Sequence, residues 1–290
     1  MYKPKFSTIA HAHHSQNGQN PLPLSFTVLA WNLQKVDFSH FIHRPIENLL
    51  SIQAPHILSL QEAKTVLSQN KFFNLPFAMA PNIETAKKHF GVVTASSATP
   101  KPLRQCLTQT RECGWMTHKT ALITQHKLTD NQTLIHVNIH AINFVTHALF
   151  NKELRILWVQ LAQHQGPMIV SGDFNTWNTT RLKILFQATQ QLNLQPVPFT
   201  DSRLIKTLLR QPLDHIFYRG LQLQDYQRIR AEFDFERLHT ITRQVFAILT
   251  GQCSDARYVG ASPDGRIHGN LGQQCSIGGI GHNNHNVVCK

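Results

Sequence analysis

An apolar run that leads directly into a cluster of polar residues is the feature that most constrains the fold of this chain. Residues 167–170 are apolar, and residues 171–177 read Ser-Gly-Asp-Phe-Asn-Thr-Trp. A buried strand with this ending carries Asp173 and Asn175 to one edge of a sheet, and because side chains alternate along a strand, both face the same side. A carboxylate accepts hydrogen bonds from water or binds a metal, whereas an amide also donates to phosphate oxygens. The pattern therefore predicts a functional edge on a buried sheet.

Length and composition indicate a globular chain that can bury a large core. The chain has 290 residues, of which 41% are hydrophobic, and one α/β domain of this size is common. Mean hydropathy is -0.24, and no stretch approaches the roughly 20 apolar residues that a membrane-spanning helix needs. Residues 1–23 carry His and Gln where a secretory signal would have its apolar segment. We therefore expect a cytoplasmic monomer without a transmembrane segment.

The net charge bears on the class of binding partner, and the cysteine usage bears on the state of the thiols. The chain has 28 basic and 16 acidic residues, a formal net charge of +12, and 18 histidines. A basic surface favours polyanions such as nucleic acid through counterion release, but it also serves solubility, and we weight these two interpretations equally. The five cysteines form no Cys-x-x-Cys pair. That usage fits reduced thiols better than a disulfide framework or a zinc site.

The spacing of apolar residues predicts strands and helices that alternate without a strict βαβ rhythm. Several neighbouring strands lie close enough in sequence to form hairpins, which favours a mixed sheet system with helices outside. The predicted strands are 26–32, 57–62, 90–95, 120–125, 134–139, the segment leading into Asp173, and 213–218. The predicted helices are 41–52, 63–70, 147–164 and 181–192.

The residue composition and the apolar pattern divide the chain into three parts. Residues 1–23, rich in His, Gln, Asn and Pro, are predicted to be a disordered leader, which is a better interpretation than a loose metal site. Residues 24–227 carry the alternating apolar segments and form the predicted domain. Residues 228–290 are atypical: we expect a helix over 228–249, then an irregular or disordered segment rich in Gly, Asn, Gln and His.

Polar side chains stand at the ends of the predicted apolar strands, where an apolar sheet would exclude them. Because burying such groups without a partner is expensive, we expect them to converge only where they share a ligand. The candidate site residues are Asn32, Glu62, His140, Asp173, Asn175 and Asp214.

The residue types at these positions suit the handling of phosphate with a metal ion. Glu62 offers the hard carboxylate oxygen that Mg²⁺ prefers, and Asn32 could orient a metal-bound water without adding charge. His140 could donate to a phosphoryl oxygen where charge develops. Asp173 could orient or deprotonate the attacking water, and Asn175 would steady the phosphate.

Each candidate also has a purely structural interpretation. A single Asn32, Glu62 or Asp214 at a strand end is usually a cap or turn residue, and a single His140 is more often a structural histidine. Lys119 precedes a predicted strand and could face phosphate, but a solvated lysine is the better interpretation. The ordered set, with each member closing an apolar strand, is what favours a shared site.

The chain resembles the endonuclease/exonuclease/phosphatase superfamily, which has the fold of DNase I and of the exonuclease III-type repair enzymes, and within it a small uncharacterised bacterial branch. The resemblance covers about residues 25–227. The matching segments are Ala-Trp-Asn-Leu-Gln-Lys (30–35), Leu-Gln-Glu-Ala (60–63), Val-Asn-Ile-His-Ala-Ile-Asn-Phe (137–144), Ser-Gly-Asp-Phe-Asn-Thr-Trp (171–177) and Pro-Leu-Asp-His-Ile-Phe-Tyr-Arg-Gly (212–220).

The resemblance implies a fold and a reaction. The fold is a four-layer α/β sandwich, in which two mixed, mainly antiparallel sheets pack face to face with helices outside. The reaction is hydrolysis of a phosphate ester assisted by Mg²⁺ or Mn²⁺. By this resemblance, Asn32 and Glu62 would serve the metal site, and His140 would stabilise the pentavalent transition state. Asp173 would position or activate the water, and Asn175 would contact the phosphate. The family also implies that Asp214 orients a catalytic histidine.

That histidine belongs to a Ser-Asp-His motif near the end of family members, and this chain departs from the pattern. The motif should follow soon after Gln227, and it does not; Ser254 and Asp255 are followed by Ala256. Asp214 and His215 already match the preceding family motif, and neighbours in a strand face opposite ways. We therefore hypothesise a frameshifted or rearranged C-terminus, which would remove a core strand and expose a sheet edge.

Three functional hypotheses follow from these patterns. The first is a Mg²⁺-dependent phosphoester hydrolase, acting on nucleic acid or another phosphate ester and impaired by loss of the final histidine. Such a loss costs on the order of 10²–10⁴ in rate. The second is a non-catalytic protein that binds nucleic acid or another polyanion through its basic surface. The third is a non-functional product of a damaged gene.

Overall fold

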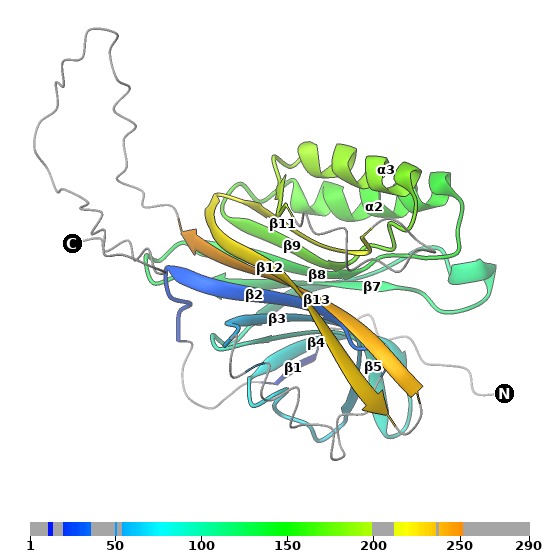
Figure 1. The fold of residues 1–290 in the computed structure, drawn as a ribbon, viewed down its shortest axis with the longest axis horizontal. Coiled ribbons are helices and arrows are strands. Elements are labelled where there is room, and N and C mark those ends of the chain that lie inside the picture. Colours follow the sequence, from blue (N-terminus) through cyan, green and yellow to red (C-terminus); the bar gives the residue numbers. More distant parts are fainter. Residues whose placement is uncertain are drawn as a thin grey trace, which may run out of the picture. The chain divides into compact units, whose positions relative to one another are not determined.

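Two β-sheets form the framework of the computed structural model, which describes residues 11–13, 20–35, 50, 54–198, 212–235 and 238–251 (Figure 1). In the described part of the chain, the seven-stranded sheet has the order β1 (His11–His13), β4 (Phe77–Glu84), β5 (Lys88–Ser96), β3 (Ile57–Val66), β2 (Ser25–Asn32), β13 (Leu238–Gly251) and β12 (Leu221–Phe235). The six-stranded sheet has the order β10 (Gln195–Pro196), β11 (Asp214–Arg219), β9 (Met168–Asp173), β8 (Thr133–His140), β7 (Thr120–Lys127) and β6 (Lys101–Leu107).

The two sheets are mixed, and their inner faces share a core. The pairs β2–β3 and β8–β9 are parallel, and the other named pairs are antiparallel. Val28 of β2 and Ile57 of β3 lie in one buried apolar cluster with Leu134 of β8, Ile169 of β9 and Ile216 of β11. Packing of apolar residues from both inner faces is what holds such sheets together. The expected α/β sandwich of two mixed sheets is therefore confirmed.

Two helices cover the outer face of the six-stranded sheet in Figure 1. Helix α2 (His147–Leu161) is capped by Thr146 and α3 (Thr179–Gln190) by Asn178, each side chain accepting from a backbone N–H of the first turn. Both confirm helices expected from the spacing, with shifted ends. A short 3₁₀ turn, η1 (Glu112–Gly114), precedes β7. Among the described helices, none has the length and apolarity needed to span a membrane.

A buried polar contact joins the sheets next to the ends of their central strands. Gln61 Nε2 of β3 donates to Asn138 Oδ1 of β8 over 2.8 Å. The Asn138 amide donates in turn to the carbonyl of Val93 (2.8 Å) and that of Leu60 (3.2 Å). Because both side chains are fully buried, the hydrogen bonds between them and to the backbone fix how β3 lies over β8. The residues that follow, Glu62 in β3 and His140 in β8, are thereby placed across from one another.

Near the N-terminus, ordered structure begins earlier than expected. His11–His13 form β1 and pair with β4, so these residues contradict the expected disordered leader. Leu22 is fully buried and bridges Leu128, which places it in the core rather than before it. Leu22 stands between Pro21 and Pro23, and prolines within a short apolar run argue against a strand, which explains why the pattern missed it. Residues 1–10 and 14–19 lie outside the described part.

The helix expected over residues 63–70 is wrong, because β3 continues to Val66. A register shift between Leu60 and Ala63 inserts one extra residue, after which Ala63–Val66 go on pairing with β5. Such a bulge interrupts the alternation on which strand prediction depends. Of the helix expected over residues 41–52, only Leu50 is described, and it is helical.

The helix expected over residues 228–249 is also wrong. These residues belong to a hairpin of β12 and β13, and β13 pairs antiparallel with β2 from Gln244↔Trp31 to Thr250↔Ser25. The sheet therefore keeps a strand beside β2, and the expected loss of a core strand is contradicted. The unit that contains the described residues extends to Gly251, beyond the expected boundary at residue 227. Residues 252–290, expected to be irregular, lie outside the described part.

Candidate active site

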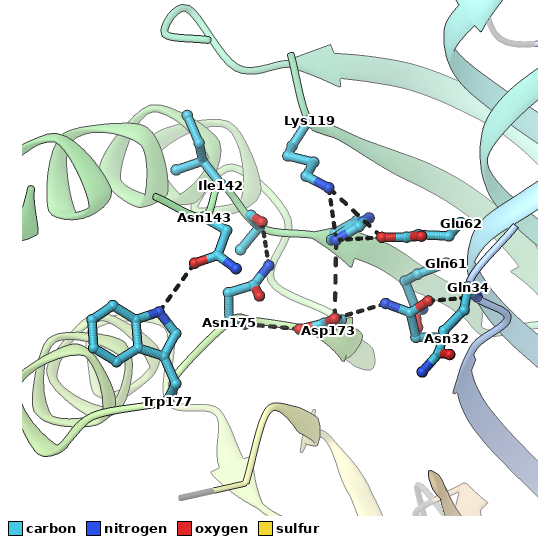
Figure 2. Close-up of polar contacts among 12 residues, drawn as sticks. Asn32, Gln34, Gln61, Glu62, Lys119, Ile142, Asn143, Asp173, Asn175 and Trp177 are labelled. Carbon is cyan, nitrogen blue, oxygen red and sulfur yellow. Dashed lines mark hydrogen bonds and ion pairs between the residues drawn. The ribbon is translucent and has the colours of Figure 1, made fainter. Parts of the chain in front are cut away.

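Three strand ends and one bulge bring candidate residues together at one edge of the sandwich (Figure 2). Asn32 ends β2, His140 ends β8 and Asp173 ends β9, while Glu62 lies at the bulge of β3. The parallel pairs β2–β3 and β8–β9 direct these carboxyl ends the same way. Glu62 has a positive φ of 49°, a conformation that is rare for residues other than glycine. The bulge and this φ angle set the position of Glu62 within the cluster.

Asp173 is the most constrained carboxylate of the cluster. Its Oδ2 accepts from Asn32 Nδ2 over 2.8 Å, and its Oδ1 accepts from the backbone N–H of Asn175 over 2.9 Å. The side chain is buried, and burial raises the pKa of Asp173, whereas these hydrogen bonds and the nearby Lys119 act in the lowering direction. Each oxygen keeps a second lone pair after these contacts, so the carboxylate can still accept from a water.

Glu62 lies between two ammonium groups. Its Oε1 is 3.9 Å from Lys119 Nζ, and its Oε2 is 4.0 Å from Lys35 Nζ. The Glu62 side chain is 22% exposed, so it is the more open of the two carboxylates that face His140. The backbone of Lys35 donates to the Glu62 carbonyl over 3.0 Å, which folds the turn after β2 over this residue.

His140 lies between the two carboxylates. Its Nε2 is 3.8 Å from Glu62 Oε1 and 3.9 Å from Asp173 Oδ2. The same atom is 3.1 Å from Lys119 Nζ. Burial, and then the charges of Lys119 and Lys35, lower the pKa of His140 well below its usual value. The imidazole is therefore neutral near neutral pH.

Lys119 and Glu112 are the residues of this cluster that sequence reasoning missed. Lys119 is buried rather than solvated, which corrects the expectation for this residue. Its ammonium lies 3.5 Å from Glu112 Oε2, and Glu112 is itself buried in the turn before β7. The apolar strand that follows Lys119 was the available signal for its burial. Glu112 stands in a polar segment, where no local pattern marks a buried acid.

Asn175 and Asp214 occupy less direct positions at this edge. The Asn175 side chain is buried, and its Nδ2 donates to the Ala141 carbonyl over 2.8 Å, so this amide fastens the loop after β8. Asp214 begins β11 directly opposite Asp173, and paired residues of antiparallel strands point to the same face. The structure thus places both residues beside Asp173, and their expected roles remain predictions.

The middle of β13 passes the same edge, at the place where the Ser-Asp-His motif was expected. Gln244 of β13 stands opposite Trp31, the residue before Asn32. The three residues before Gln244 are Ile-Thr-Arg (241–243), and none is a histidine. His239 pairs with Asp234 and lies five residues before Gln244 along β13. A strand therefore lies beside β2 at the site, but it does not carry the Ser-Asp-His motif.

Two mixed sheets that gather carboxylate, imidazole and amide groups at one edge define the DNase I-like class of α/β sandwich. The family model of the Endonuclease/Exonuclease/phosphatase family matches residues 17–232. This match covers most of the chain, so the chain belongs to that family. Membership indicates a hydrolase of the nuclease and phosphatase type.

Solved structures of the same family share the fold at low sequence identity. A protein from Beutenbergia cavernae DSM 12333 matches with a TM-score of 0.54 and 13% identity, covering 78% of this chain and 71% of that one. One from Bacteroides thetaiotaomicron matches with a TM-score of 0.54 and 14% identity, covering 81% and 100%. One from Leptotrichia buccalis C-1013-b matches with a TM-score of 0.52 and 12% identity, covering 77% and 99%. At these identities the likeness concerns the fold alone.

Proposed function

We propose that this chain is a phosphoester hydrolase that depends on Mg²⁺ or Mn²⁺. The convergence of Asn32, Glu62, His140 and Asp173 at one edge carries the proposal, because each comes from a different strand and all bear groups that handle phosphate and water. Packing alone does not require such a set, since burying polar groups of this kind is costly.

The donors at this edge fit a hard divalent cation. In the described part of the chain, no cluster of three or more His, Cys, Asp or Glu side chains is arranged as a metal site. Mg²⁺ commonly uses only one or two protein carboxylates, with water and substrate phosphate completing its shell. Glu62 would supply that carboxylate from its partly open position, with Asn32 paired to the preceding residue, Gln61, on the neighbouring strand. A metal ion bound there would neutralise developing charge on the phosphate.

Asp173 is the proposed group that orients and activates water. Asn32 and the Asn175 backbone hold both of its oxygens in place, so a bound water would have a fixed direction. The raised pKa of Asp173 makes its carboxylate a stronger base than an exposed aspartate. His140 and Asn175 would border the phosphate, and Asp214 would support the site from β11.

Nucleic acid is the proposed substrate class, because the net charge of +12 favours a polyanion. We also propose a monomer in the cytoplasm, with residues 20–251 as the catalytic domain. A second candidate is a non-catalytic polyanion-binding protein. The missing Ser-Asp-His motif favours this alternative, since the residues before Gln244 hold no histidine at that place.

Cleavage of plasmid DNA and of bis-nitrophenyl phosphate tests the proposal. We expect hydrolysis with Mg²⁺ or Mn²⁺ that EDTA abolishes and that Glu62→Gln strongly reduces. Asp173→Asn is expected to lower kcat by about 10²–10⁴-fold. Asp130→Asn makes the same charge change in an exposed turn and serves as the control.

Two other outcomes would point elsewhere. Cleavage that persists in EDTA and in Glu62→Gln would contradict the metal-dependent hydrolase. Salt-sensitive DNA binding without any turnover would support the polyanion-binding alternative, because counterion release makes such binding fall steeply with salt.

A further inference from the structure

Lys119 carries an enclosed ammonium group at the centre of the site. Its side chain is 11% exposed and it directly precedes β7. Three groups surround Nζ: His140 Nε2 at 3.1 Å, Glu112 Oε2 at 3.5 Å and Glu62 Oε1 at 3.9 Å. In Figure 2 the ammonium points toward Glu62 and the strand end that carries Asp173.

Glu112 holds this ammonium in place. Its side chain is 6% exposed, and its Oε1 accepts from the backbone N–H of Asn143 over 2.8 Å. The second oxygen is thereby directed at Lys119. Lys35, the other lysine near Glu62, is 58% exposed and lies 4.0 Å from Oε2. Lys119 is therefore an enclosed, held cation of the site, whereas solvent screens the exposed charge of Lys35.

The contact with His140 assigns the direction of hydrogen bonding. An ammonium has three donors and no acceptor, so Lys119 donates and His140 Nε2 accepts. The imidazole cannot then donate from that same nitrogen, which is the atom nearest to both Glu62 and Asp173. Glu112 can accept a hydrogen bond from a second N–H of Lys119. The third remains on the side of Glu62, whose oxygen at 3.9 Å is beyond hydrogen-bond distance.

We propose that Lys119 donates to a non-bridging phosphate oxygen of the substrate, and that Glu112 is its positioning residue. The inference rests on the proposed function and adds to it the cation that binds the phosphate from the protein side. A small pocket of about 20 Å³ borders Glu62, Lys119 and His140. A water needs roughly 10–15 Å³ of such space, so one oxygen fits there. A purely structural Lys119–Glu112 pair would support folding without affecting anion affinity.

Titration with inorganic phosphate in the presence of EDTA tests this assignment without metal or turnover, by calorimetry or ³¹P NMR. We expect Lys119→Met to weaken phosphate binding by about tenfold or more, the usual effect of losing one hydrogen bond from a charged donor. Lys127→Met removes the same charge from the exposed far end of β7, and we expect it to leave the affinity unchanged.

A second variant distinguishes a loss of phosphate binding from a failure to fold. Lys119→Met leaves Glu112 buried without its cation, which is destabilising. In Lys119→Met/Glu112→Gln the amide oxygen still accepts from Asn143 and no charge is stranded. Thermal unfolding establishes that this double variant folds, and we expect the same loss of phosphate affinity. Unchanged affinity in either folded variant would overturn the assignment, as would the absence of phosphate binding by the unmodified chain.

The result is separable from that of the hydrolase proposal. A chain that binds phosphate through Lys119 yet does not hydrolyse bis-nitrophenyl phosphate with Mg²⁺ would support the role of Lys119 and contradict the proposed reaction. A chain that hydrolyses normally while Lys119→Met binds phosphate as tightly as before would contradict the role of Lys119 alone.

Discussion

Among single residues, Arg181 connects the two loops that border the site. It is fully buried, and its guanidinium donates to the carbonyls of Val145 (2.9 Å), Ile142 (3.1 Å) and Asn175 (3.2 Å). Its Cζ lies 4.5 Å from the ring centroid of Phe150. One side chain thus ties the loop after β8 to the loop after β9, which carry the residues next to His140 and Asp173. A planar group with five donors suits this better than lysine would.

Replacing Arg181 is expected to loosen both loops. Arg181→Met leaves three buried carbonyls without their donor, and we expect a loss of about 2–4 kcal/mol in the free energy of unfolding. Urea denaturation measures this loss. Arg155→Met, at an exposed position of α2, is the control and should stay within about 0.5 kcal/mol of the unmodified chain. Equal stability of the two variants would contradict the role given to Arg181.

Among the elements, β13 shows how a long-range partner decides local structure. Its sequence was consistent with a helix, yet it lies in the sheet between β2 and β12. It pairs with β2, which stands about as far away in sequence as the domain allows. From Gln244 to Thr250 the backbone of β13 is paired on both sides, whereas the spacing of its side chains carries no record of the partner β2. The hairpin also gives β2 a second neighbour up to Trp31, the residue before Asn32.

A proline in β13 tests this placement. Ala247 pairs with Val28 on one side and Tyr226 on the other. Ala247→Pro should therefore cost about 3 kcal/mol or more, because it removes a ladder hydrogen bond inside a sheet. Leu103→Pro is the matched control, since it falls at the register shift of the edge strand β6. A comparable loss of stability for both variants in urea denaturation would argue against a central β13.

At the scale of the whole molecule, two buried histidines link stability to pH. His126 and His136 are both buried, with ring centroids 6.1 Å apart, and His136 Nε2 contacts Ser171 Oγ at 2.9 Å. Burial lowers the pKa of His126 to about 4, and it lowers that of His136 in the same direction. Between the folded and the unfolded values, only the unfolded chain is protonated, so acid favours unfolding.

We therefore expect the free energy of unfolding to fall as pH drops below about 6.5, the ordinary histidine value. For His126 alone the loss at pH 4 amounts to roughly 3 kcal/mol. The raised pKa of Asp173 acts in the opposite direction, because it favours the protonated folded state at low pH. Urea denaturation across this range measures the slope. His126→Gln should flatten it, and the exposed His147→Gln should not; an equal slope in both would contradict the assignment.

The sequence by itself determined the family, the mixed α/β sandwich and the strand ends that carry Asn32, His140 and Asp173, whereas Glu62, expected at a strand end, lies at a bulge within β3. Those signals are local: an apolar run and the polar residue that closes it lie side by side in the chain. Only the tertiary structure decided that Lys119 and Glu112 are buried beside His140, and that β13 completes the sheet next to β2. These facts depend on which distant strands pair and which loops meet at one edge, and such contacts leave no periodic trace in the sequence.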